Sequence, residues 1–328
     1  MGAKEKKLTI ADIAEHLGVS KTTVSRAMSG KGRISEETRS RVREYVEAAE
    51  YTPNVLAKGL AQSKTYNIAV ILPIDCNVTE LPFFQSCMYG ICEAASKRNY
   101  DVLAVYTREG ETGDLERIIS NHKIDGVVLS RTLWKDAAAD YVKAKHVPVV
   151  AVGSSSDNNL VQVDHDHRSA CCELTTLLLQ QGIRNLGMIG GKESHVVTRN
   201  RYEGFADAFR LAGKPVNPEH IILGTGSAEE IEKAVDRLLS MKVESIVCMD
   251  DMICSHVLKQ LKKRKISVPE QMRVASFYSG SFEEKHKVPT LEFDAVKLGQ
   301  VTGNTLLDLI EGKETPGKQL LPYKVVQA

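Results

Sequence analysis

The stretch IADIAEHLGVSKTTVSRAMSGKG, residues 10–32, decides the fold of the N-terminal part of the chain. Its apolar residues recur at helical spacing, and Gly18 interrupts them. Thr9 is placed to cap the first helix, with Asp12 three residues later to complete a capping box, and Ser20 is placed to cap the second helix. The pattern predicts two short helices joined by a tight glycine turn, which is a helix-turn-helix unit.

A third helix and a linker are expected next. Ser35 precedes the third helix, because Glu36 and Glu37 suit the positive end of a helix dipole. The segment YTPNVLAKGLAQSKT, residues 51–65, predicts a short helix that is marginal by itself, since Gly59 costs about 1 kcal/mol relative to Ala. The apolar face of the third helix would be formed by Val42, Tyr45, Val46 and Ala49.

The composition is that of an ordinary soluble protein with two or three domains. The chain has 328 residues, more than one hydrophobic core usually supports, and 42% of them are hydrophobic and 26% charged. The sequence has no apolar run of membrane-spanning length and no signal-peptide core, so we expect a cytoplasmic protein. Seven cysteines without CxxC spacing predict reduced thiols and argue against a disulfide framework or a zinc site.

Charge is unevenly distributed along the chain. Residues 1–64 hold twelve Lys and Arg against eight Asp and Glu, whereas the net charge of the whole chain is only +1. A small basic head on a faintly acidic body indicates that the head is the part that meets a polyanion.

From Asn67 onward, short apolar runs alternate with amphipathic stretches. This alternation is typical of parallel sheets covered by helices. The length of the series predicts two similar lobes with a cleft between them, where loops at the carboxyl ends of the strands contact a ligand. The expected strands are Ile68–Leu72, Val102–Val105, Gly126–Leu129, Val147–Val152, Leu186–Ile189, Ser245–Met249 and Val274–Phe277.

Five segments together resemble one known family. They are TIADIAEHLGVSKTTVSRAMSG, YTPNVLAKGL, VQVDHDHRSA, NRYEGFADAF and VCMDDMICSHVL, in this order. Over essentially its whole length the chain resembles the lactose-repressor/galactose-repressor (LacI/GalR) family of bacterial transcription regulators. The resemblance implies an α/β protein with a three-helix helix-turn-helix head, a hinge helix and two Rossmann-like parallel-sheet lobes of the periplasmic-binding-protein type. The implied boundaries are residues 1–52 for the head, 53–65 for the hinge helix and linker, 66–163 and 294–323 for lobe 1, and 164–293 and 324–328 for lobe 2.

The resemblance implies that the second helix lies in the DNA major groove. Side chains of the types that reach base edges and phosphates are expected on its exposed face, namely Lys21, Thr22, Ser25 and Arg26. The resemblance puts Lys21, Thr22 and Arg26 at positions that read the operator, and Arg26 can bind guanine in a bidentate manner. The alternative is that these side chains form only a solvated face. Thr9 is a further candidate DNA contact.

In the linker, Leu60 falls where the family has a leucine that wedges into the minor groove and kinks the duplex. Ala57 and Lys58 would flank this wedge, and Lys58 replaces the usual Arg, which keeps the charge but loses the planar fork. Asn54 is the remaining candidate DNA contact of the linker. The alternative is that Leu60 packs against the body.

For the cleft, the resemblance implies that Arg201 grips effector oxygens and that Asp250 hydrogen-bonds a hydroxyl group or a base. Asp251 would then cap the following helix. The alternatives are an inter-lobe ion pair for Arg201 and a capping role for Asp250. Phe84 would stack on a ring of the effector, with a place in the core as its alternative.

Three further effector contacts are expected near strand ends. Asp75 follows the first strand, and Asp164 lies near the cleft at the start of the second lobe. Ser279 belongs to FYSGS, residues 277–281, where relatives carry Gly-Tyr-Asp-Asn. The missing acid indicates an effector other than the commonest hexoses, or a modified or phosphorylated one. The DHDH stretch, residues 164–167, is a poor metal site because it has no Cys or Glu companions.

Together these observations predict a sequence-specific DNA-binding transcriptional regulator, namely a repressor controlled by a sugar or related metabolite. It would act as a cytoplasmic homodimer, bound to the nucleoid at a pseudo-palindromic operator, with no metal, cofactor or membrane partner. The sequence shows no catalytic constellation, so an enzyme is not expected. A transcriptional activator of the same family and a stand-alone ligand-binding protein are the alternatives.

Overall fold

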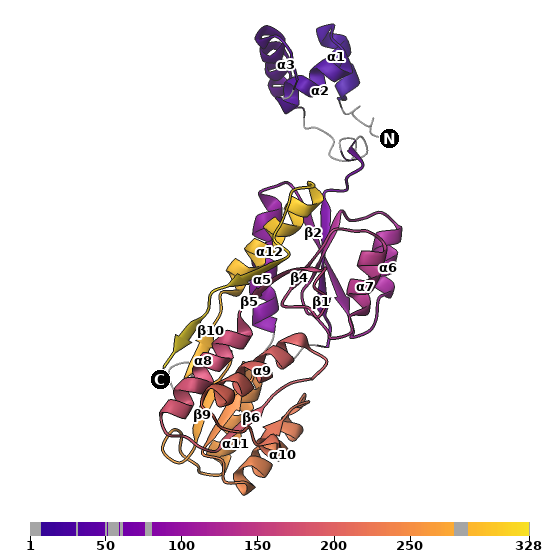
Figure 1. The fold of residues 1–328 in the computed structure, drawn as a ribbon. Helices are drawn as coiled ribbons and strands as arrows, with labels where there is room; N and C mark the ends of the chain where they lie inside the picture. Colours follow the sequence, from indigo (N-terminus) through magenta and orange to yellow (C-terminus); the bar gives the residue numbers. More distant parts are fainter. Residues whose placement is uncertain are drawn as a thin grey trace. The chain divides into compact units, whose positions relative to one another are not determined.

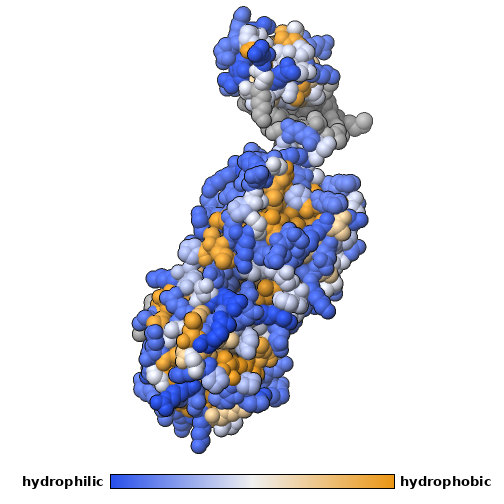
Figure 2. Space-filling model, viewed as in Figure 1, coloured by the Kyte–Doolittle hydropathy of each residue, from blue (hydrophilic) through white to orange (hydrophobic). Residues whose placement is uncertain are grey.

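The computed structural model describes residues 8–30, 32–49, 51, 59, 62–75, 81–278 and 288–327. The chain divides into two compact units, Met1–Thr65 and Tyr66–Ala328, here called the head and the body. Each unit has its own hydrophobic core. Hydrophilic residues dominate the viewed face, and hydrophobic residues show through in separate areas (Figure 2). Among the described residues, no helix is long and apolar enough to cross a membrane.

The head contains the three predicted helices, α1 (Ile10–Leu17), α2 (Lys21–Ser29) and α3 (Glu36–Ala48). The capping box of α1 is confirmed, because the Thr9 hydroxyl accepts from the Asp12 backbone N–H and the Asp12 carboxylate accepts from the Thr9 N–H. The Ser20 hydroxyl likewise accepts from the Thr23 N–H at the start of α2. Gly18 ends α1 in the left-handed conformation, which glycine adopts without steric cost.

One small core holds the head together. It is formed by Ile13, Ala14, Val24, Ala27 and Val42, with Tyr45 and Val46 packed against it. The prediction for Ala49 was wrong, because α3 ends one residue earlier and Ala49 is the exposed residue that follows it.

The body contains two six-stranded sheets. The first sheet has the order β11-β5-β4-β3-β1-β2, with every pair parallel, and the second has the order β12-β10-β9-β8-β6-β7, with β12 antiparallel to β10. The first sheet comprises β1 (Asn67–Pro73), β2 (Asp101–Thr107), β3 (Gly126–Leu129), β4 (Val149–Val152), β5 (Val161–His165) and β11 (Lys318–Leu321). The second comprises β6 (Leu186–Ile189), β7 (Ile221–Ile222), β8 (Ser245–Cys248), β9 (Arg273–Ser276), β10 (Thr290–Glu292) and β12 (Lys324–Val326).

All seven predicted strands are confirmed: Gly126–Leu129 and Leu186–Ile189 have the predicted ends, and the ends of the other five differ by at most two residues. The strands that the sequence analysis missed are β5, β7, β10, β11 and β12. They lack a continuous apolar run, because β5 carries Gln162, Asp164 and His165 and the others are short or at the edge of a sheet. Polar residues inside a buried strand remove the pattern on which the prediction depends.

Helices cover both faces of the first sheet (Figure 1). Alternate residues of β1 divide between them: Val70 packs with Ile91 of α5 (Leu81–Ser96), whereas Ile71 packs with Leu115 of α6 (Gly113–Ser120). The other helices of this lobe are α12 (Ala295–Ile310), beside α5, and α7 (Ala137–Ala144), beside α6. Burial on both faces explains why β1 reads as an unbroken apolar run.

The second sheet is covered in the same way. Its helices are α8 (His167–Gln180), α9 (Val196–Leu211), α10 (Ala228–Ser240) and α11 (Asp251–Lys263), with a 3₁₀ turn at Pro218–His220. One continuous core fills this lobe and includes Phe205, Leu238 and Ile253. The chain passes between the lobes three times: from β5 into α8, from β10 into α12 and from β11 into β12.

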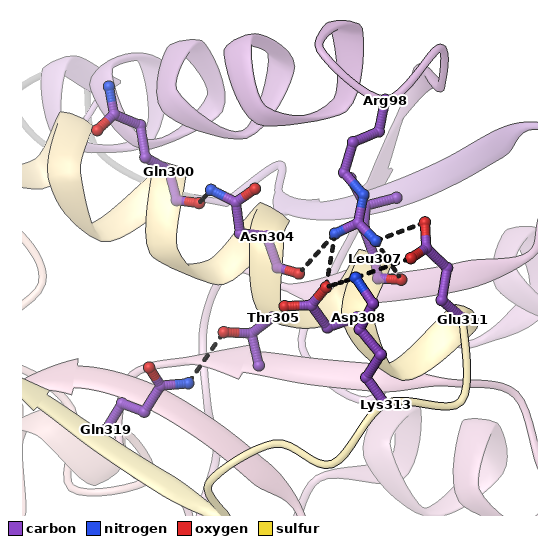
Figure 3. Close-up of polar contacts among 9 residues, drawn as sticks. All are labelled: Arg98, Gln300, Asn304, Thr305, Leu307, Asp308, Glu311, Lys313 and Gln319. Carbon is purple, nitrogen blue, oxygen red and sulfur yellow. Dashed lines mark hydrogen bonds and ion pairs between the residues drawn. The ribbon is translucent and has the colours of Figure 1, made fainter.

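A polar network secures the carboxyl end of α12 to the residues that follow α5 (Figure 3). The guanidinium group of Arg98 forms ion pairs with Asp308 and Glu311 and donates to the Asn304 and Leu307 carbonyl oxygens. The Lys313 ammonium group contacts both acids from the other side. Cations near the last carbonyl groups of a helix also interact favourably with its dipole. The network therefore stabilises the contact between α12 and the residues that follow α5.

The α5–α12 contact is close because glycine occupies it. A Cβ atom at Gly299 would overlap the Cys87 carbonyl oxygen, which is backbone and has little room to move. We therefore expect Gly299→Ala to lower the free energy of unfolding of the body by about 1–3 kcal/mol, measured by chemical denaturation. Gly113→Ala is the control, because nothing lies within 4 Å of a Cβ atom there. Equal stability of the two variants would contradict the close contact.

Candidate DNA-binding and effector sites

The exposed face of α2 carries the four predicted DNA contacts. Lys21, Thr22, Ser25 and Arg26 are all exposed, whereas Val24 and Ala27 face the core of the head. The stem of Arg26 lies beside Gly32, since a Cβ atom at Gly32 would meet the Arg26 Cδ at 2.9 Å. The core residues thus orient the four polar side chains toward solvent together.

The other predicted DNA contacts divide into two groups. Thr9 is exposed, and its hydroxyl lies 2.6 Å from the Asp12 carboxylate as part of the α1 cap. Asn54, Ala57, Lys58 and Leu60 lie outside the described residues.

A cavity of about 240 Å³ lies between the two sheets of the body. Its walls are the segments that follow the carboxyl ends of strands, including Asp75 after β1, Arg131 after β3, Lys192 after β6 and Met249 after β8. This is the edge at which parallel α/β sheets bind ligands. Five of the six predicted effector contacts line this cavity, namely Asp75, Phe84, Asp164, Arg201 and Asp250, while Ser279 lies outside the described residues.

Arg201 reaches the cavity from the inward face of α9, where Val197, Thr198 and Arg201 recur at helical spacing. Its Nη1 donates to the Met249 carbonyl oxygen at 2.6 Å, and its guanidinium carbon lies 5.9 Å from the centre of the Tyr278 ring. Its Nε is buried and has no hydrogen-bond partner among the described residues. Those residues include no carboxylate in an ion pair with Arg201, so the alternative of an inter-lobe ion pair is not found.

Asp250, and not Asp251, caps α11. The Asp250 carboxylate accepts a hydrogen bond of 2.8 Å from the Ile253 N–H, and Asp251 is the first residue of the helix. The capping role predicted for Asp251 was therefore wrong, and the alternative kept open for Asp250 is found. Burial raises the pKa of Asp250. The Asp250 side chain lines the cavity as well, so capping does not remove it from the site.

Asp164 is buried at the end of β5, where its carboxylate accepts hydrogen bonds from the Ser154 N–H and hydroxyl and from the His165 N–H. Burial raises the pKa of Asp164 to about 6, in spite of those hydrogen bonds. Burial also lowers the pKa of His165 to about 4 and that of His167 well below its ordinary value, so both imidazoles are neutral at pH 7. The described residues contain no group of His, Cys, Asp and Glu side chains that could hold a metal ion.

Aromatic rings form the wall beside these imidazoles. Phe293 lies 4.9 Å from His165 and 4.6 Å from His167, and Tyr278 stacks on Phe293 at 5.9 Å between ring centres. Phe84 lines the cavity and meets the edge of Phe83. The cavity therefore combines apolar ring faces with a few buried polar groups, as ligand sites do.

Several residues that line the cavity are not among the predicted contacts, notably Arg131, Lys192 and His195. Arg131 forms an ion pair with Asp75 at 3.1 Å, and Lys192 lies 3.7 Å from the same carboxylate. Burial raises the pKa of Asp75, but the charges of these two cations outweigh it and lower the pKa overall. Arg131 and Lys192 lie two and three residues after the ends of the predicted strands Gly126–Leu129 and Leu186–Ile189, so their positions after strand ends were the available signal.

A helix-turn-helix head in one chain with a two-lobed body and an inter-lobe cavity defines a DNA-binding regulator of the ligand-responsive class. Residues 9–54 match the lacI family of bacterial regulatory proteins, and residues 65–320 match periplasmic binding proteins and the sugar-binding domain of the LacI family. The chain belongs to the LacI family and is a DNA-binding transcriptional regulator.

Known proteins of this family match along the whole chain. The HTH-type transcriptional regulator MalR of Streptococcus pneumoniae is 26% identical over 331 residues, which cover 98% of this chain and 99% of MalR. Two solved structures share the fold: the Lac repressor dimer bound to operator and the anti-inducer ONPF, and the regulator CelR in complex with cellobiose. The first has a TM-score of 0.75 at 20% identity, covering 98% of both chains. The second has a TM-score of 0.73 at 23% identity, covering 97% of this chain and 98% of CelR.

The raised pKa of Asp164 predicts a pH dependence with a definite sign. The folded protein holds the Asp164 proton more tightly than the unfolded chain does, so the stability contributed by Asp164 is present below pH 4 and is lost as the pH rises to about 6. The pKa values of His165 and His167 are shifted in the opposite direction. The wild type is therefore compared with Asp164→Asn, which keeps both histidines. We expect the unfolding free energy of the wild type, relative to the variant, to fall by up to about 3 kcal/mol between pH 4 and 7. A difference that does not change with pH would contradict the burial of this carboxyl group.

Proposed function

We propose that this regulator is a repressor that binds a pseudo-palindromic operator as a homodimer and is controlled by a small molecule in the inter-lobe cavity. The convergence of Asp75, Phe84, Asp164, Arg201 and Asp250 on one cavity carries the proposal, because they come from both lobes and from distant parts of the sequence. The effector is a sugar or a related, modified or phosphorylated metabolite. The regulator acts in the cytoplasm, where the DNA is, and has no catalytic activity.

Recognition of DNA is assigned to the exposed face of α2. Lys21, Thr22, Ser25 and Arg26 would enter the major groove and read base edges, and Thr9 at the start of α1 would contact a phosphate. A single recognition helix covers one half-site, so a two-fold dimer is needed to read both halves. In the linker, Leu60 would wedge into the minor groove, with Asn54, Ala57 and Lys58 beside it.

Control by the effector follows from a shift between two conformations of the body. A ligand changes DNA affinity only to the extent that it binds one conformation better, and a coupling of about 1–3 kcal/mol gives about a 5- to 150-fold change. The buried Arg201 Nε, which has no hydrogen-bond partner among the described residues, is the polar group proposed to bind the effector, and Ser279 remains a prediction from the sequence. Activation in place of repression would reflect the position of the operator relative to the promoter and would use the same sites.

Arg26→Ala tests the assignment of α2. With a duplex selected from a random library by the wild-type protein, we expect the variant to bind about 10- to 100-fold more weakly and to bind random DNA almost as well as before, because a lost base contact removes discrimination. The control is Arg43→Ala, which removes the same charge from an exposed site on α3. Equal weakening on selected and random DNA would show that Arg26 contacts only phosphate.

Arg201→Ala tests the cavity. A thermal-shift screen of the full chain against sugars, sugar phosphates, nucleosides and purines is expected to give a compound that raises the unfolding temperature by about 5 °C at a hundredfold excess over its Kd. We expect that shift to vanish in Arg201→Ala and to remain in Arg210→Ala, whose side chain lies on the same helix but pairs with Asp207 at the surface. A shift that survives in Arg201→Ala would place the compound elsewhere.

A further inference from the structure

Two short segments, one from each lobe, pair across the solvent-exposed edge of the cavity. Leu133 and His195 form an antiparallel β-bridge. The Trp134 N–H donates to the Ser194 carbonyl oxygen at 2.8 Å, and the Val196 N–H donates to the Thr132 carbonyl oxygen at 3.2 Å. Thr132 and His195 also line the cavity, so the bridge lies directly beside it.

The Trp134 and Val196 amides each donate to an acceptor in the other lobe. Val196 is the first residue of α9, and the first N–H groups of a helix have no acceptor within the helix. The Leu133 N–H differs, because it donates to the Asp136 carboxylate within lobe 1. Each segment is also held in its own lobe: the Thr132 hydroxyl donates to the Ser154 carbonyl oxygen, and the Arg199 Nε donates to the Glu193 carbonyl oxygen. Because each segment is held within its own lobe, the hydrogen bonds between the two segments form and break together.

Charged side chains flank the bridge on either side. Lys192, from lobe 2, lies 3.3 Å from the Glu109 carboxylate and 3.7 Å from the Asp75 carboxylate, both in lobe 1. On the other side, the Arg199 guanidinium group stacks over the Trp134 ring, with 4.2 Å between its central carbon and the ring centre. Trp134 is the only tryptophan of the chain and is 47% exposed.

We propose that residues 131–134 and 192–199 form a latch that holds the two lobes closed over the cavity and must open for the cavity to be reached. Its parts are individually weak, because exposed ion pairs and cation–π contacts each contribute little, so the latch opens and closes without unfolding either lobe. The buried apolar clusters lie within single lobes, and Phe83 of lobe 1 meets Tyr278 of lobe 2 only edge-on, with 6.1 Å between the ring centres. The inference rests on the proposed function only in naming the cavity as the effector site.

Lys192→Ala tests the latch by hydrogen exchange in the full chain. We expect the Trp134 and Val196 amides to exchange at least fivefold faster than in the wild type, since their acceptors belong to the other lobe. The Leu133 amide is the internal reference and keeps its exchange rate if lobe 1 remains folded. The matched control is Lys233→Ala, whose ion pair with Glu229 stays within α10. Unchanged exchange at Trp134 and Val196 would overturn the proposal.

Fluorescence gives an independent measure, because Trp134 is the sole tryptophan and Lys192 is not among its partners. Opening removes Arg199 from one face of the indole ring, so we expect acrylamide to quench Trp134 more strongly in Lys192→Ala than in the wild type. Quenching equal to that of the wild type would count against the latch.

A reversible lock tests access to the cavity. Leu133 and His195 are opposite each other in the β-bridge, with no hydrogen bond between their own backbone groups. Residue pairs of this kind have Cα atoms about 4.5 Å apart, which is within the range of a disulfide. In Leu133→Cys/His195→Cys, oxidation is expected to slow exchange of the Trp134 and Val196 amides and to slow modification of His165 and His167 by diethyl pyrocarbonate. Dithiothreitol should reverse both, and each single-cysteine variant is a control.

Equal reactivity of His165 and His167 in the oxidised and reduced lock would show that the cavity is reached by another route and would overturn the proposal. None of these measurements uses DNA or an effector. Failure of the latch therefore leaves the proposed function standing, and failure of the effector screen leaves the latch test valid.

Discussion

The body depends on the parallel alignment of all strands but β12 in its two sheets. Parallel pairing requires a crossover after each strand, so the segments that follow β1, β3, β6 and β8 all emerge at the carboxyl edge of their sheet. Three passages of the chain between the lobes turn both of these edges toward one cavity. Side chains that are far apart in the sequence therefore meet at one cavity.

The cavity keeps buried polar atoms that the described residues leave without a hydrogen-bond partner. Among the described residues, the buried Arg201 Nε, His165 Nε2, His167 Nδ1 and His195 Nε2 have no hydrogen-bond partner, and all four residues line the cavity. Leaving a buried polar group unpaired costs about 1–3 kcal/mol, so a fold selected for stability alone would pair or remove them. The carboxylate of Asp164, by contrast, is fully engaged by Ser154 and His165. The unpaired atoms therefore support the proposal of a polar effector in this cavity.

Packing within the lobes differs from contact between them. Each lobe buries apolar side chains in its own clusters, and glycine lets α5 and α12 approach so closely that Gly299 meets the backbone of Cys87. The described contacts between the lobes beside the cavity instead include a β-bridge, ion pairs of Lys192, the stacking of Arg199 on Trp134 and the edge-on contact of Phe83 with Tyr278. Strong cores with weak links between them let each lobe move as a rigid body, which a ligand-controlled regulator requires.

The sequence by itself determined the helices of the head, their caps and most of the strands, because these depend on local spacing and on residues such as Thr9, Ser20 and Gly18. The resemblance also pointed to Arg201 and Asp250, which line the cavity, and residue type pointed to the polar face of α2. Only the tertiary structure decided that Asp250 caps α11, that β5 is a strand despite its polar residues, and that Arg131, Lys192 and His195 face the cavity. The physical reason is that burial and pairing between distant segments are set by the strand order and the passages between the lobes, which have no local pattern in the chain.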